Sequence, residues 1–159
     1  RSRLGHGTTL ALQGLPRLTA QTQRVVTEQT LAAPGMLSGL RVCLIEDDHN
    51  VLRATTALLQ RWGCEEDAHS SAQVTNRDCD VIVADYDLGQ EATGVDCIER
   101  LRAQRGWAVP ALIMTGHDPD RIQAVVQGRD IAVLSKPVRP AELRAALRTL
   151  CEGSAAPVG

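Results

Sequence analysis

The sequence predicts an α/β fold built on a parallel sheet, and two observations lead to this prediction. First, short apolar runs separated by helical patterns are typical of buried parallel strands. Four such runs occur far apart in the chain, at residues 42–45, 81–84, 111–114 and 131–135. Second, each run is followed by acidic, hydroxyl or amino side chains, and an open α/β sheet collects the residues after its strands in one crevice. These residues are Glu46, Asp47 and Asp48, then Asp85, Thr115 and Lys136.

The first half of the pattern contains two strands and one clear helix. Residues 40–46 read as a strand, and residues 49–62 carry apolar side chains at helical spacing before Gly63. Residues 64–69 form a weaker strand that is polar enough to lie at a sheet edge. Residues 70–78 then leave room for only a short helix.

The second half alternates strands and helices more regularly. In order, we expect a buried strand (81–84), a loop (89–94), a helix whose face is set by Val95, Ile98 and Leu101, a strand (109–114), a short helix (119–127) and a last strand (131–134). Pro140 suits the first turn of a final helix. Its apolar stripe consists of Leu143, Ala146, Leu147 and Leu150. The whole pattern predicts five βα units.

Composition fits one domain with an aliphatic core. The 159 residues are 43% hydrophobic but include no Phe, one Tyr and two Trp. A net charge of −2 gives no electrostatic footprint for nucleic acid or an anionic membrane. No apolar run approaches the roughly 18 residues of a membrane span, and no signal peptide is visible. Five cysteines without a C-x-x-C pair favour neither a disulfide framework nor a zinc site, so we expect a cytoplasmic domain, whose parent protein could be membrane-anchored.

The ends of the chain do not continue the α/β pattern. Residues 19–38 are rich in Thr, Gln and Ala and read as a linker, and residues 153–159 read as a disordered tail. The expected α/β domain therefore spans residues 39–152. The chain begins with Arg1 rather than Met, which indicates a piece of a longer protein.

The residues gathered after the strands suit phosphoryl chemistry. A carboxylate can attack a phosphoryl group only if the repulsion between the two anions is neutralised, and Mg²⁺ does this with oxygen ligands. Asp47 and Asp85 could supply carboxylates to the ion, with Glu46 acting directly or through a water. The backbone carbonyl of Asp87 lies within reach of the same position.

The same residues suggest how a phosphoryl group would be captured. Asp85 would be the nucleophile, forming an aspartyl phosphate by in-line displacement. Lys136 would place its ammonium on a phosphoryl oxygen as charge develops. Thr115 would donate its hydroxyl to another oxygen once phosphate is present.

Four motifs resemble those of the response-regulator receiver domain. They are LIEDD (44–48), DVIVADYDLG (80–89) with Gly94 and Asp96 following, IMTG (113–116) and LSKPV (134–138). The resemblance covers residues 39–152. It implies a flavodoxin-like, three-layer α/β/α fold whose five parallel strands lie in the order 2-1-3-4-5.

The resemblance also implies roles for individual residues. Asp85 would be the phosphoacceptor, Glu46 and Asp47 the acidic pair that holds Mg²⁺ or Mn²⁺, Thr115 the switch hydroxyl and Lys136 the essential lysine. The Lys136–Pro137 bond would be cis. The partner would be the phosphohistidine of a histidine kinase or phosphotransfer domain, and the receiver would catalyse its own phosphorylation and dephosphorylation.

Two departures from the family pattern bear on signal output rather than on the phosphorylation chemistry. Val133 stands where many receivers carry a switching Tyr or Phe, so the resemblance does not carry over the usual coupling of the hydroxyl to an aromatic ring. The loop at residues 89–94 lacks the proline common after the phosphoacceptor strand. A weak homodimer could form through the fourth or fifth helix.

Residues 5–16 carry a second resemblance. They look like the final strand and trailing Leu-Pro of a histidine-kinase ATPase domain, which places the possible end of such a domain at residues 1–18. A kinase end, a linker and then a receiver is the order found in a hybrid histidine kinase. The valine before Leu134 also resembles hybrid-kinase receivers.

Two other functions remain open from the sequence. A Toprim-like, Mg²⁺-dependent nucleic-acid enzyme would use Glu46 with Asp85 and Asp87, although the near-neutral charge and the Lys136-Pro137 pair disfavour it. A receiver fold kept only for docking would not need the full acid, hydroxyl and lysine set. His49, His69 and His117 read as surface or loop residues, and His117 could modulate access to the crevice.

Overall fold

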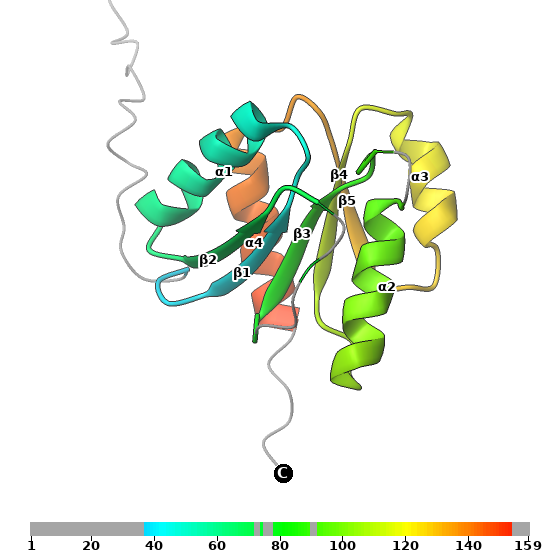
Figure 1. The fold of residues 1–159 in the computed structure, drawn as a ribbon, viewed down its shortest axis with the longest axis horizontal. Coiled ribbons are helices and arrows are strands. Elements are labelled where there is room, and N and C mark those ends of the chain that lie inside the picture. The colour runs from blue at the N-terminus through cyan, green and yellow to red at the C-terminus, as the bar shows by residue number, and fades with distance from the viewer. Residues whose placement is uncertain (1–36, 72–73, 75–77, 90–91, 154–159) are drawn as a thin grey trace, which may run out of the picture. The chain divides into compact units, whose positions relative to one another are not determined.

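The computed structural model describes residues 37–71, 74, 78–89 and 92–153 (Figure 1). The predicted kinase-domain end at residues 1–18, all but the last two residues of the predicted linker, and the tail beyond Gly153 lie outside the described residues. Leu37, at the start of the described part, is buried in the core of the α/β domain.

Five strands and four helices make up the described part of the chain. In order they are β1 (Arg41–Ile45), α1 (His49–Arg61), β2 (Glu65–His69), β3 (Val81–Asp85), α2 (Gly94–Arg105), β4 (Ala111–Thr115), α3 (Pro119–Val126), β5 (Ile131–Ser135) and α4 (Pro140–Gly153). The five predicted strands and the helices predicted at residues 49–62 and 119–127 begin and end within two residues of their observed bounds. None of the four helices has both the length and the apolar character needed to cross a membrane.

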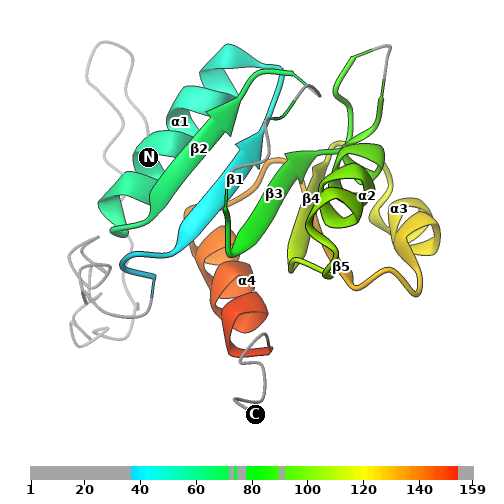
Figure 2. The ribbon, with the colours of Figure 1, turned by 60° about the horizontal axis from the view of Figure 1, so that its bottom comes forward.

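All five strands are parallel and lie in the order β2-β1-β3-β4-β5. This confirms the expected flavodoxin-like fold and strand order. The arrowheads of β1, β2 and β3 point the same way in Figure 2. The carboxyl ends of the strands therefore meet at one edge of the sheet, where the residues that follow them are brought together.

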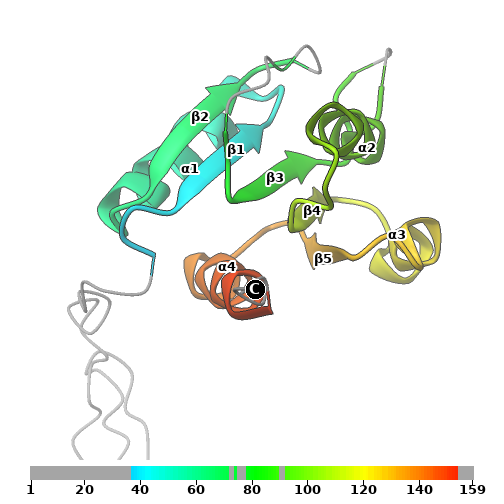
Figure 3. The same ribbon diagram turned by 90° about the horizontal axis from the view of Figure 1, so that it is seen from below.

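Helices cover both faces of the sheet and form the expected three layers. Figure 3 shows α1 and α4 on one face and α2 and α3 on the other. Alternate strand residues enter the two cores, because successive side chains of a strand point to opposite faces. Val42 and Leu44 belong to the core under α1 and α4, whereas Cys43 and Ile45 belong to the core under α2 and α3.

The helices begin at capping residues that the sequence supplies locally. Asp48 accepts hydrogen bonds from the backbone N–H groups of Asn50 and Val51 and so caps α1. Thr93 and Asp96 form a capping box at the start of α2. Asp118 caps α3 by accepting a hydrogen bond from the backbone N–H of Asp120. These caps place the N-termini of three helices at the same edge as the strand ends.

The connection between β2 and β3 differs from the prediction of five βα units. Within residues 70–78, the described residues Ser70, Ser71, Val74 and Asp78 are not helical, and the others lie outside the described part. The physical reason lies in β2. Its Asp67 and His69 pair with Cys43 and Ile45 of β1, on the face that α2 and α3 cover elsewhere. Because these two side chains are polar, this end of the sheet offers little apolar surface for a helix to bury.

Candidate functional site

Three carboxylates converge where β1 and β3 end. Asp85 is the last residue of β3, and Glu46 and Asp47 directly follow β1, the neighbouring strand. Glu46 is fully buried and Asp85 is nearly so, whereas Asp47 is exposed. One carboxylate oxygen from each lies within 4.8 Å of the others. The predicted convergence of these residues is thus what the structure shows.

This spacing suits a hard divalent cation. Mg²⁺ binds oxygen ligands at 2.0–2.1 Å in octahedral geometry, so two oxygens on opposite sides of the ion are about 4.2 Å apart. The spacing of the three carboxylates is therefore compatible with one ion held among them, either directly or through a water. The donor set contains oxygen alone, with no sulfur or imidazole, and such a set favours Mg²⁺ or Mn²⁺ over zinc.

Lys136 reaches the three carboxylates from the end of β5, the strand at the edge of the sheet beyond β4. It follows β5, and its Nζ lies 2.9 Å from Glu46 Oε2 and 2.9 Å from Asp85 Oδ2. Its backbone N–H donates to the carbonyl of Thr115, which ties the ends of β4 and β5 together. The Lys136–Pro137 peptide bond is cis, as the resemblance predicted.

Burial and ion pairing together shift the pKa values of Glu46 and Lys136. Burial raises the pKa of the Glu46 carboxyl above its ordinary value, and the hydrogen bond from Lys136 offsets only part of this effect. Burial by itself would lower the pKa of the Lys136 ammonium. Hydrogen bonds to Asp85 and Glu46 outweigh burial, so the pKa of Lys136 is raised and its positive charge is stabilised.

Glu46 is held by protein donors on both of its oxygens. Oε2 accepts from Lys136, and Oε1 accepts from the backbone N–H of Asp48 at 3.3 Å. A cation ligated directly by Glu46 would compete with these bonds, whereas Asp47 is open to solvent. The sequence left open whether Glu46 binds the ion directly or through a water. This arrangement favours binding through a water.

Thr115, at the end of β4, and Asp87, on the loop after β3, lie beside the carboxylates. Thr115 ends β4 next to β3 and is fully buried, and its Oγ1 accepts a hydrogen bond of 3.0 Å from the backbone N–H of His117. The Asp87 carboxylate is directed to His117, with its Oδ2 2.9 Å from Nε2. The Asp87 side chain is thus engaged by His117, and the metal-binding role expected for its backbone carbonyl stays a prediction.

His117 is the residue whose contacts the sequence reading did not identify. Its ring meets Asp87, and it also packs edge-on against the ring of Tyr86, with the ring centroids 5.6 Å apart. The only signal in the sequence was its position two residues after Thr115. His49, by contrast, is exposed at the start of α1, as expected.

Gly94 allows α2 to begin directly against the acceptor strand. A Cβ atom at this position would lie 2.0 Å from the backbone carbonyl oxygen of Asp85, which is closer than any side chain tolerates. The N–H of Gly94 donates to the carbonyl of Tyr86 at 2.9 Å. The helix thereby packs against the two peptide groups that directly follow Asp85, and only glycine leaves the room for this.

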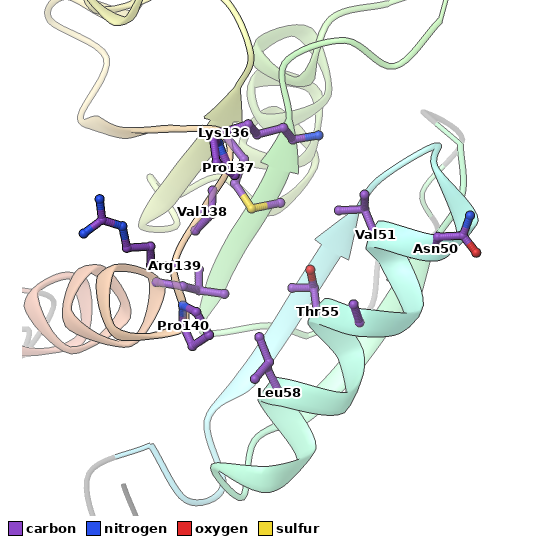
Figure 4. Close-up of a pocket in the computed structure, with 12 residues that line it drawn as sticks. Asn50, Val51, Thr55, Leu58, Lys136, Pro137, Val138, Arg139 and Pro140 are labelled. Atoms are coloured by element: carbon purple, nitrogen blue, oxygen red, sulfur yellow. The ribbon is translucent and has the colours of Figure 1, made fainter. Parts of the chain in front are cut away.

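An apolar groove of about 670 Å³ runs alongside the site, between α1 and the segment after β5. Figure 4 shows Val51, Thr55 and Leu58 of α1 facing this segment, with Lys136 at one end. We call this hollow the α1 groove. The remaining residues that line it are Asn50, Ala54, Met114, Pro137, Val138, Arg139, Pro140 and Leu143.

Comparison with known proteins gives the same result at the level of family. A family model described as the response regulator receiver domain matches residues 42–148, more than half of the chain. The response regulator protein TodT of Pseudomonas putida is 28% identical over 114 residues, which cover 67% of this chain and 49% of that protein. The chain thus spans about half the length of the curated relatives it matches.

Solved structures show the same fold. A CheY-like receiver domain protein from Methanospirillum hungatei matches with a TM-score of 0.65 and 20% identity, covering 73% of this chain and 96% of that one. The receiver domain of PhyR from Erythrobacter litoralis matches with a TM-score of 0.66 and 20% identity, covering 79% and 99%. A sensor protein from Polaromonas sp. JS666 matches with a TM-score of 0.63 and 22% identity, covering 72% and 97%.

Proposed function

Since this chain belongs to the response regulator receiver family of two-component signalling, we propose that it accepts a phosphoryl group from a phosphohistidine onto Asp85 and changes conformation when it does so. One observation carries the proposal. The Lys136 ammonium lies 2.9 Å from a carboxylate oxygen of Asp85, inside a cluster of three carboxylates. This arrangement joins a nucleophile, a cation and a set of oxygen ligands in one place.

The charge balance of the cluster calls for a bound cation. Glu46, Asp47 and Asp85 bring three negative charges when ionised, and Lys136 compensates one of them. A phosphoryl donor adds further negative charge, and like charges at this distance repel strongly in a partly buried site. Mg²⁺ or Mn²⁺, held by Asp47, Asp85 and the backbone carbonyl of Asp87, would neutralise this charge. Glu46 would bind the ion through a water.

The protein groups then have separate tasks. A carboxylate oxygen of Asp85 attacks the phosphorus while the bond between phosphorus and the histidine nitrogen breaks. The electron pair of the broken bond returns to the imidazole. The Lys136 ammonium moves from the Asp85 carboxylate to a phosphoryl oxygen and forms an ion pair there. Thr115 donates its hydroxyl hydrogen to another phosphoryl oxygen. This last step draws the loop after β4 toward Asp85 and starts the conformational change.

A small phosphodonor tests the proposal directly. We expect acetyl phosphate with Mg²⁺ to label Asp85, as located by mass spectrometry of peptides, and EDTA to prevent labelling. Asp85→Asn, which is nearly isosteric, should remove the label without unfolding the protein. Label on a different residue of wild-type protein, or no label at saturating Mg²⁺, would show that the proposed function is wrong.

The donor protein would approach over the α1 groove. This apolar surface lies beside Lys136, where apolar side chains of a helix that carries the phosphohistidine would pack. We further propose that the donor is a histidine kinase or phosphotransfer domain and that the parent protein is a hybrid histidine kinase. The resemblance of residues 5–16 to the end of a kinase ATPase domain supports this origin. Purified candidate kinases, compared for the rate of transfer to this chain, would identify the donor.

The two alternative functions fit the site less well. A Toprim-like enzyme needs the carboxylate of Asp87 beside that of Asp85, and here the Asp87 carboxylate contacts His117. A docking module has no use for a half-buried lysine paired with two buried carboxylates, because such groups are costly to desolvate. Cleavage or relaxation of plasmid DNA by the purified chain would favour the first alternative over our proposal.

A further inference from the structure

One contact joins the two loops that flank the acceptor. His117, on the loop between β4 and α3, places its Nε2 2.9 Å and 3.1 Å from the two carboxylate oxygens of Asp87, on the loop between β3 and α2. We propose that His117 is a positioning residue that holds the Thr115 hydroxyl in its unphosphorylated position, with Asp87 as the anchor. This inference rests on the proposed function.

His117 reaches Thr115 and Asp87 with different groups. Its backbone N–H donates to Thr115 Oγ1 at 3.0 Å, and its ring contacts Asp87. A threonine hydroxyl can accept this bond and still donate its hydrogen. To follow a phosphoryl group on Asp85, however, the oxygen must either leave the N–H of His117 or carry His117 with it. The first movement breaks the hydrogen bond from His117, and the second strains the contact between His117 and Asp87.

The anchor itself is well supported. Asp87 forms an isolated antiparallel bridge with Thr93, which caps α2 through its capping box with Asp96. The adjacent Tyr86 accepts a backbone hydrogen bond from Gly94 and packs its ring edge-on against His117. The loop carrying Asp87 is therefore fastened to α2. Movement of Thr115 must be taken up by the other loop, the one that carries His117.

This contact also offers a route for the signal that the sequence does not otherwise provide. Val133 occupies the β5 position where many receivers carry an aromatic switch residue, and it is a partly buried aliphatic side chain packed on the core. It has no ring that could turn to follow Thr115. His117 adjoins Asp118, the cap of α3, so release of the His117 ring would be passed directly to the start of that helix.

The size of the expected effect follows from exposure. The side chains of His117 and Asp87 are 47% and 60% exposed, so their contact is screened by water. An exposed ion pair changes an equilibrium by about two- to fivefold. We therefore expect His117→Ala to accelerate phosphorylation by acetyl phosphate by about two- to fivefold at saturating Mg²⁺.

A double-mutant cycle separates positioning from a general structural role. His117→Ala, Asp87→Ala and the double variant should all show the same acceleration, because each removes the same contact. Asp87→Ala keeps the backbone carbonyl proposed for the metal. His117→Gln, whose amide can still donate to Asp87, should restore the slower wild-type rate. His49→Ala is the matched control, since it removes an exposed histidine from the same edge of the sheet.

The outcomes distinguish this inference from the proposed function. If wild-type protein is not labelled on Asp85, the proposed function fails, and this inference fails with it. If wild type is labelled but His117→Ala and Asp87→Ala match its rate, or if their effects add in the double variant, only the inference is overturned. If His117→Ala sharply lowers the midpoint of thermal unfolding, the phosphorylation rates of Asp87→Ala and His117→Gln still test the inference.

Discussion

At the scale of single residues, Lys136 determines the charge balance of the site. Its ammonium bridges Glu46, which is fully buried, and Asp85, which is nearly so. A carboxylate buried without a partner is costly because water no longer solvates it. The same lysine that is proposed to bind the phosphoryl group therefore also stabilises the resting protein. Its two roles can be separated experimentally.

We predict that Lys136→Ala lowers the free energy of unfolding by roughly 2–3 kcal/mol, since it leaves the buried Glu46 charge unpaired. Adding Glu46→Gln removes that charge and should recover most of the lost stability. Phosphorylation of Asp85 should stay lost in both variants. Urea denaturation and labelling with acetyl phosphate measure the two effects. A double variant no more stable than Lys136→Ala would contradict the explanation.

At the scale of elements, β1, β3, β4 and β5 each deliver part of the site at their carboxyl ends, and α2 supports the acceptor strand. β3 carries Asp85, and α2 begins against it at Gly94, where no side chain fits. On the opposite face, α1 forms one wall of the α1 groove, where its half-buried Val51 and Leu58 lie outside the core cluster on that face. A groove of this kind affects recognition of a protein donor but not of a small molecule.

We predict that Val51→Asp slows phosphotransfer from a phosphohistidine protein at least tenfold, because a charge in the groove must be desolvated on docking. The rate with acetyl phosphate should stay within about twofold of wild type. Ala57→Asp is the matched control, since it adds the same charge at an exposed position of α1 that does not line the groove. Equal slowing by both variants, or slowing with acetyl phosphate, would argue against docking at this groove.

At the scale of the whole domain, the strand order explains why four distant segments act together. β3 lies between β1 and β4, so Asp85 has the acidic pair on one side and Thr115 on the other. The opposite edge of the sheet serves stability rather than chemistry. There the Arg41 guanidinium lies 2.7 Å from Asp80 Oδ1, and the backbone N–H of Arg41 donates to Oδ2 of the same carboxylate.

The ion pair between Arg41 and Asp80 predicts how the stability of the protein depends on pH. The hydrogen bond from the Arg41 side chain lowers the pKa of Asp80 below its ordinary value of 3.8. The stabilisation it provides is present above that value and is lost as the pH falls through the lower pKa of the folded protein. We expect urea denaturation to show a loss of stability below about pH 4 that is smaller in Asp80→Asn. Asp78→Asn, whose carboxylate is 89% exposed, should behave like wild type.

Much of this site could be predicted from the sequence, because its parts directly follow buried strands. Central strands buried on both faces need continuous apolar runs, and those runs are visible without a structure. Asp85 and Thr115 end two such strands, and Lys136 directly follows a third. The secondary structure of residues 70–78 was harder to predict, since so short a segment has too few apolar positions to indicate or exclude a helix.

The sequence by itself determined which chemical groups are available and that they gather at one edge, because local periodicity depends only on neighbouring residues. Only the tertiary structure decided that Lys136 bridges Glu46 and Asp85, that the Asp87 carboxylate turns to His117, and that a groove opens beside α1. These contacts join residues 30 to 90 positions apart. They depend on how loops and helices pack against one another, and no local pattern in the chain encodes that packing.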